Sequence, residues 1–166
     1  MDFEISHQIA APAETVAEAL LDEEYQHSLH DIGALHQREL LSQEELGDGR
    51  VSRKVRCVLD IDLNPTVRRL VGQGDPAWIE ESTWTPTESR WEWVIRPEIG
   101  GEMLTAKGTV DIEGSGDKTE RHVRGHVKVG VPIYGGKVER WIVEGLESAY
   151  EEEAERLSEW IERENS

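Results

Sequence analysis

Apolar and polar residues alternate with a period of two along most of the chain, the pattern of half-buried β-strands. The first such run covers residues 2–9 and places Phe3, Ile5, His7 and Ile9 on one face. Further strand-like runs cover residues 34–42, 50–60, 78–85, 90–96, 102–112 and 119–131. Turn-forming residues separate several of these runs, so we expect an antiparallel sheet of seven strands.

The period changes where helices are expected. Pro12 and Glu14 suit the first turn of a helix after the first strand, and a second short helix should end before Gly33. Residues 66–70 are consistent with a short turn of helix. After Pro132, apolar residues recur at intervals of three and four as far as Ile161, which predicts one long amphipathic helix. The fold class is therefore α+β.

The hairpin over residues 78–96 has a predictable register because its connection, residues 86–89, is short. The facing pairs on its apolar row are Trp84 with Trp91, Ser82 with Trp93, and Glu80 with Ile95. Three tryptophans on one face of one hairpin could line a pocket for an apolar guest or fill the core. Small residues at inward positions favour the pocket: Ala106, Gly108, Gly125, Gly145 and Ala149.

Composition narrows the classes of function. The length of 166 residues fits a single domain, residues 1–166, and no interdomain linker interrupts it. The chain has 35 acidic and 18 basic residues and a net charge of -17, which repels nucleic acid and anionic membranes. No run of residues reaches the length of a membrane span, and residues 1–9 do not have the pattern of a signal peptide. The only cysteine, Cys57, excludes a disulfide within the chain and fits a reducing cytoplasm.

Charged residues on inward rows need partners. Arg53 and Glu80 lie on rows assigned to the inner face, so we expect them to pair with each other. Such a pair is either structural or a polar anchor for a ligand. A catalytic role for Glu80 would require a raised pKa.

No motif in the chain indicates a catalytic triad, a metal centre or a nucleotide cofactor. His27 and His30 are three residues apart in the second predicted helix, but no third metal ligand can be placed beside them. Tyr134 and Trp141 flank the start of the long helix, where we expect the mouth of a cavity. We therefore predict no cofactor, metal or catalytic residue.

The order of elements, a strand, two short helices, six more strands and a long terminal helix, resembles the START-like superfamily, also called SRPBCC or helix-grip. The stretch from Val127 to Glu139, followed by an acidic helix ending near Trp160 and Ile161, is similar to an actinobacterial START-like family of unknown function. The resemblance implies a curved sheet wrapped around the long helix. It also implies a cavity between them, which relatives use for lipids, sterols, polyketides or plant hormones.

Three functions agree with these observations. The first is binding or carriage of a small hydrophobic molecule, lipid or polyketide-like, by Arg53, Glu80, Gly108, the three hairpin tryptophans, Tyr134 and Trp141. The second is a cyclase or hydrolase-type enzyme that uses Glu80 with Arg53 in the same cavity. The third is a protein-interaction module that docks a basic partner on the acidic terminal helix. A homodimer stays open as an oligomeric state.

Overall fold

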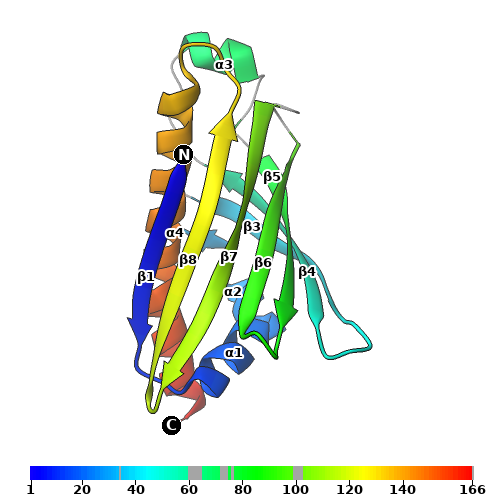
Figure 1. Cartoon of the computed structure of the whole chain (residues 1–166), viewed down its shortest axis with the longest axis vertical. Helices are drawn as coiled ribbons and strands as arrows, with labels where there is room; N and C mark the ends of the chain where they lie inside the picture. Colours follow the sequence, from blue (N-terminus) through cyan, green and yellow to red (C-terminus); the bar gives the residue numbers. More distant parts are fainter. Residues whose placement is uncertain (34, 60–64, 72–74, 76, 99–102, 166) are drawn as a thin grey trace.

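The computed structural model describes residues 1–33, 35–59, 65–71, 75, 77–98 and 103–165 (Figure 1). The strands are β1 (Asp2–Ile9), β2 (Asp31–Ile32), β3 (Leu35–Glu45), β4 (Val51–Leu59), β5 (Ala77–Thr85), β6 (Arg90–Pro97), β7 (Leu104–Ser115) and β8 (Lys118–Val129). The helices are α1 (Ala13–Leu21), α2 (Glu23–Ser28), α3 (Pro65–Val71) and α4 (Gly135–Glu164).

All the strands belong to one antiparallel sheet with the order β1-β8-β7-β6-β5-β4-β3-β2. Seven of them are the predicted strands, and the two-residue β2 adds a short edge beside β3. The helix-grip prediction is confirmed, because the curved sheet holds α4 along one face (Figure 1). In that view α1 and α2 lie near the C-terminal end of α4, and α3 lies at the opposite end.

The hairpin of β5 and β6 has the predicted register. Trp84 faces Trp91, Ser82 faces Trp93, and Glu80 faces Ile95. The alternation of buried and exposed residues continues through β8, where Val123 and Val127 are buried and Arg124 is exposed. We call the face of the sheet that packs on the helices the inner face and the opposite one the outer face.

The long helix α4 is amphipathic, as predicted. Its buried residues are Gly135, Val138, Ile142, Val143, Gly145, Leu146, Ala149, Leu157 and Ile161. Its solvent side carries acidic residues such as Glu144 and Glu155. Among the described residues, no helix combines the length and apolar character that crossing a membrane requires.

The structure departs from the predicted elements at Pro12 and within β3. Pro12 is the N-cap of α1 and precedes its first turn, because its extended backbone (ψ 151°) is not helical. In β3, Gln37 has a left-handed backbone (φ 56°), and the pairing with β4 shifts between His36 and Glu39. Such a bulge changes which side chains face inward.

Candidate functional site

Polar side chains gather in the interior, between the inner face of the sheet and α4. They come from α2, from β3, β4, β5 and β8, and from α4. We call them the inner polar cluster: Gln26, Arg38, Arg53, Glu80, Arg121, Tyr150 and Glu153. They surround a cavity of about 60 Å³, whose remaining lining residues are Leu20, Ser82, Trp91, Trp93 and Val110.

Arg121 connects the sheet to α4. Its side chain is only 1% exposed and forms an ion pair with Glu153. A second guanidinium nitrogen donates to the Tyr150 carbonyl at 2.9 Å and lies 3.4 Å from Nδ1 of His7. Burial and the nearby Arg121 charge lower the pKa of His7. The Nε hydrogen of Arg121 has no acceptor among the described residues.

Arg53 is held at the C-terminal end of α1. Its Nε donates to Oε1 of Gln43 at 2.9 Å, and another guanidinium nitrogen donates to the Leu20 carbonyl. The last carbonyls of a helix have no partners within it, so they attract cations and donors. The guanidinium also lies 4.2 Å from the ring centroid of Trp91. Burial lowers the pKa of Arg53 to about 10, which still leaves it charged at neutral pH.

Arg38 enters the cluster through Gln26. Two guanidinium nitrogens donate to Oε1 of Gln26 at 2.7 Å and to its carbonyl at 3.2 Å. Gln26 in turn donates to the Leu20 carbonyl at 2.8 Å. Arg38, Arg53 and Arg121 thus line the cavity. Among their described partners only Glu153, which pairs with Arg121, is acidic, so the wall beside Glu80 carries a net positive charge.

Glu80 is the least satisfied member of the cluster. It faces inward between Val55 of β4 and Ile95 of β6, and it makes no hydrogen bond or ion pair with another described residue. Burial raises the pKa of its carboxyl, and the charges of Arg38 and Arg53 only partly offset this rise. The predicted ion pair between Arg53 and Glu80 is therefore not formed, although their charges influence each other.

The tryptophan row is packed tightly, and this changes the interpretation of the glycines. Trp93 packs against Phe3 with ring centroids 6.2 Å apart. A Cβ atom on Gly125 would lie 2.6 Å from the Phe3 ring and 2.8 Å from the Trp93 ring, and one on Gly108 would also meet Trp93. At these two positions the expected free space is occupied by aromatic rings. The indole N–H of Trp93 is buried and has no acceptor in the described part of the chain.

The structure therefore divides the eight predicted ligand-binding residues. Those that line the inner cavity are Arg53, Glu80, Trp91 and Trp93. Trp84 packs behind them, with its ring centroid 5.6 Å from that of Trp91, and Gly108 supports Trp93. Tyr134 and Trp141 lie at the N-terminal end of α4 and do not contribute to this lining.

Arg38, Arg121 and Glu153 were not predicted as site residues. Arg121 shares the face of Val123 in β8, so its inward position could be predicted from the alternation. Glu153 follows Tyr150 by three residues in α4 and precedes Leu157 by four, a spacing that places it near the buried stripe. Arg38 gives no such signal, because the bulge at Gln37 changes the alternation.

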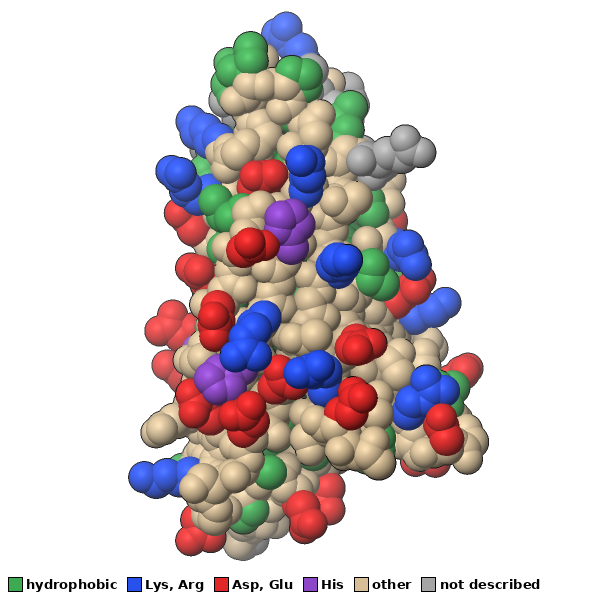
Figure 2. All heavy atoms as spheres, in the orientation of Figure 1, with side chains coloured by type: hydrophobic (Ala, Val, Ile, Leu, Met, Phe, Trp, Pro, Cys, Tyr) green, Lys and Arg blue, Asp and Glu red, His purple; other side chains and the backbone are tan. Residues whose placement is uncertain are grey.

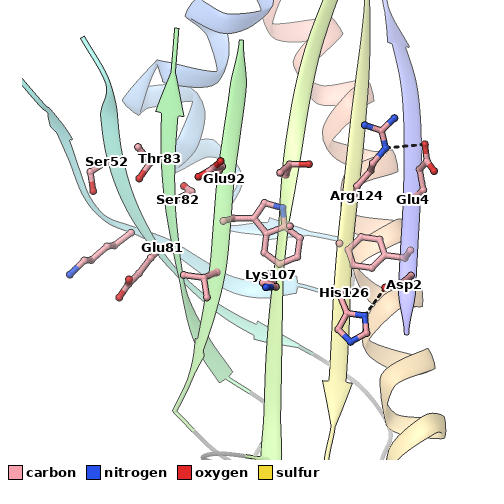
Figure 3. Close-up of a pocket in the computed structure, with 17 residues that line it drawn as sticks. Asp2, Glu4, Ser52, Glu81, Ser82, Thr83, Glu92, Lys107, Arg124 and His126 are labelled. Atoms are coloured by element: carbon pink, nitrogen blue, oxygen red, sulfur yellow. Dashed lines mark hydrogen bonds and ion pairs between the residues drawn. The ribbon is translucent and has the colours of Figure 1, made fainter. Parts of the chain in front are cut away.

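A larger hollow of about 980 Å³ lies on the outer face of the sheet (Figure 3). Its side chains mostly point away from the helices, which lie behind the strands in this view. Asp2 and His126 point toward each other with 2.6 Å between Oδ1 and Nδ1, and Arg124 lies 3.4 Å from Glu4. Figure 2 shows acidic, basic and histidine side chains interspersed over this face. We interpret it as a solvated surface in which charges neutralise one another.

Within the described residues, no group of three or more His, Cys, Asp or Glu side chains could hold an ion.

Comparisons with known proteins agree with the fold. A family model described as "Protein of unknown function (DUF2505)" matches residues 4–161. No curated protein matches the chain.

Solved structures share the whole architecture at low sequence identity. The Zhui aromatase/cyclase from Streptomyces sp. R1128 is 14% identical, with a TM-score of 0.68, and the match covers 100% of this chain and 96% of that one. A START superfamily protein from Mycobacterium smegmatis is 20% identical (TM-score 0.61; coverage 98% and 97%). Norcoclaurine synthase from Thalictrum flavum, in complex with dopamine and hydroxybenzaldehyde, is 17% identical (TM-score 0.64; coverage 100% and 88%). These matches establish the START-like fold.

Proposed function

We propose that the chain, which belongs to the DUF2505 family of unknown function, binds a small and largely apolar molecule, lipid or polyketide-like, between the sheet and α4. The observation that carries this proposal is the inner cavity, which is lined by two residues with a buried N–H group that lacks a described acceptor, Arg121 and Trp93, and by the carboxyl of Glu80. Buried polar groups are normally paired, because an unpaired one costs free energy. A bound ligand supplies the missing partners.

The aromatic and apolar residues around the cluster suit the body of such a ligand. Trp91, Trp93 and Val110 border the cavity beside the polar groups. An apolar wall with a few convergent polar groups is the usual composition of a small-molecule site. Norcoclaurine synthase, whose structure carries dopamine and hydroxybenzaldehyde, supports this use of the fold.

Native mass spectrometry of the purified protein, compared with its denatured mass, tests the proposal. We expect an additional mass of a few hundred daltons that is lost on denaturation, because a tightly held apolar guest survives purification. A purified apo protein that also fails to bind any member of a panel of fatty acids, sterols and aromatic polyketides by equilibrium dialysis would contradict the proposal.

A second candidate function is general acid–base catalysis by Glu80 in the same cavity. The specific observation in its favour is that burial raises the pKa of this carboxyl, which is the direction of shift that a carboxylic general acid or base requires. If a bound substrate is turned over, Glu80→Gln should lower kcat by about 10²-fold or more. Glu92→Gln, which alters an exposed carboxylate on the outer side of the neighbouring strand, is the matched control.

For the compartment, we propose the cytoplasm. Cys57 is a free cysteine buried in the core, and burial raises the pKa of its thiol to about 12. A neutral, buried thiol packs as a small apolar side chain and is protected from oxidation. Fractionation of the cells that express the chain, followed by immunoblotting, tests the assignment.

A further inference from the structure

We propose that the inner cavity recognises a hydroxyl group, alcoholic or phenolic, at one end of an otherwise apolar ligand. The hydroxyl oxygen accepts from Arg121 Nε–H and Trp93 Nε1–H, and its hydrogen is donated to Glu80. This inference rests on the proposed binding function and specifies the class of ligand.

Two N–H donors at the cavity have no acceptor among the described residues. The Arg121 side chain is 1% exposed and Trp93 is 6% exposed, and both border the same cavity. The terminal nitrogens of Arg121 are occupied by Glu153 and the Tyr150 carbonyl, which leaves Nε as its free donor. Buried N–H groups are usually paired, so an oxygen acceptor in the cavity would satisfy both.

The carboxyl of Glu80 is an acceptor at the same cavity. Glu80 lines this cavity and has no donor from the described residues. Its neighbours across the sheet, Val55 and Ile95, are apolar and cannot supply one. A ligand group that satisfies the whole site must therefore donate one hydrogen and accept others, which a hydroxyl group does.

Other head groups fit less well. A carboxylate would bring a second negative charge beside Glu80, and an ammonium group would face the cations of Arg38, Arg53 and Arg121. A plain hydrocarbon would leave all the unused polar groups unpaired. The cavity of about 60 Å³ is far smaller than the roughly 300–1,000 Å³ of a usual small-molecule site, so it takes the head group while the apolar body of the ligand extends beyond it.

Three probes with one ring system separate these requirements. 2-Naphthol can donate and accept, 2-methoxynaphthalene can only accept, and naphthalene can do neither. Equilibrium dialysis at pH 7 should give 2-naphthol a Kd at least about tenfold lower than those of the other two, because it alone pairs with Glu80. The Kd of naphthalene, which has no hydrogen-bonding group, measures the affinity of the apolar walls alone.

Variants locate the effect. Glu80→Leu should reduce the preference for 2-naphthol over 2-methoxynaphthalene to about one, whereas Glu81→Leu, on the outer side of the same strand, should preserve it. Trp93→Phe keeps an aromatic ring but removes the N–H, and should weaken 2-naphthol binding about fivefold relative to naphthalene. Trp84→Phe, one row away and outside the cavity lining, should leave the ratio unchanged. Continued binding of naphthalene by each variant shows that it is folded.

The outcomes distinguish the inference from the function on which it rests. Equal affinity for all three probes overturns the hydroxyl assignment and supports a purely apolar pocket. Equal affinity for 2-naphthol and 2-methoxynaphthalene, both above naphthalene, overturns the role of Glu80. No binding of any probe overturns both the assignment and the binding function.

Discussion

The sheet has a hollow on each face, and the two lie back to back across the same row of paired residues. The row runs through Arg53, Ser82, Trp93, Gly108, Gly125 and Phe3. The outer hollow is far larger, about 980 Å³ against 60 Å³. Its charges neutralise one another in contact with water, whereas the inner cavity contains buried groups without partners. The candidate site is therefore identified by unpaired buried donors that share one cavity with Glu80, and not by volume.

The two faces differ in the free energy that it costs to place a charged side chain there. An exposed pair such as Arg124 with Glu4 gains little and loses little, because water solvates both ions. A buried ion such as Arg121 keeps its charge only while its partners are in place. The same substitution should therefore have very different effects on the two faces.

The largest expected effect is on Arg121. Arg121→Met should lower the free energy of unfolding by about 3–5 kcal/mol, because it leaves the carboxylate of Glu153 without its ion-pair partner. Arg124→Met, on the outer face of the same strand, should cost less than about 1 kcal/mol. Urea denaturation measures both. Equal losses in the two variants would contradict the distinction between the faces.

The second effect concerns the packing of Trp93 against Gly108. Gly108→Ala should destabilise the protein by about 1–3 kcal/mol, because the new methyl group meets the Trp93 ring and the backbone of β8. Gly47→Ala is the control, since a Cβ there meets nothing within 4 Å. Thermal unfolding of both variants would show the difference. If Gly108→Ala left the thermal stability unchanged, open space, and not an aromatic ring, would adjoin this glycine.

The third effect is pH-dependent. The pKa of Glu80 is raised above its ordinary value of 4.5, so the folded protein retains this proton to a higher pH than the unfolded chain does. By linkage, stability associated with the protonated form is present below about pH 4.5 and is lost as the pH rises through the folded-state pKa. Glu80→Gln cannot ionise, so it should gain about 1 kcal/mol over wild type near neutral pH.

Denaturant titrations between pH 4 and pH 8 provide the test for Glu80. The advantage of Glu80→Gln should grow with pH and vanish at the acidic end. Glu92→Gln, on the outer face, should stay within about 0.5 kcal/mol of wild type throughout. If the difference in free energy of unfolding between Glu80→Gln and wild type did not change with pH, burial of the Glu80 charge would not destabilise the protein.

The smallest effect belongs to the outer face. The hydrogen bond from His126 lowers the pKa of Asp2, and His126→Ala should return that pKa toward 3.8. Because both side chains are exposed, we expect no measurable change in stability or in probe binding. Carbon-detected NMR titration of the Asp2 carboxyl, alongside urea denaturation, checks both statements. A substantial loss of stability or binding would assign the outer hollow a larger role.

Local patterns predicted the fold and part of the site. The register of the β5–β6 hairpin could be predicted to the residue. With a short turn and a period of two, only one register buries the tryptophans. The inward positions of Arg53 and Glu80 followed from the same alternation. Their partners did not, because Gln43 and the Leu20 carbonyl reach Arg53 only through the packing of α1 on the sheet.

Two features of the site lie beyond local patterns. The bulge at Gln37 turns Arg38 toward the interior, and a left-handed glutamine has no distinctive sequence signal. The contact of Arg121 with Glu153 joins residues 32 positions apart and depends on how α4 docks against β8. The expected space at Gly108 was assigned to a ligand, although the neighbouring strand supplied a tryptophan to fill it.

The most direct test of the central claim is a two-dimensional ¹H–¹⁵N NMR titration of the protein with 2-naphthol, in which the indole N–H of Trp93 is followed. We predict that this signal shifts to saturation as its hydrogen finds an acceptor, while the backbone amide signals of Lys107 and Thr109 on the outer face do not shift. A stationary Trp93 indole signal with saturating shifts at Lys107 and Thr109 would show that 2-naphthol binds in the outer hollow and not in the inner cavity.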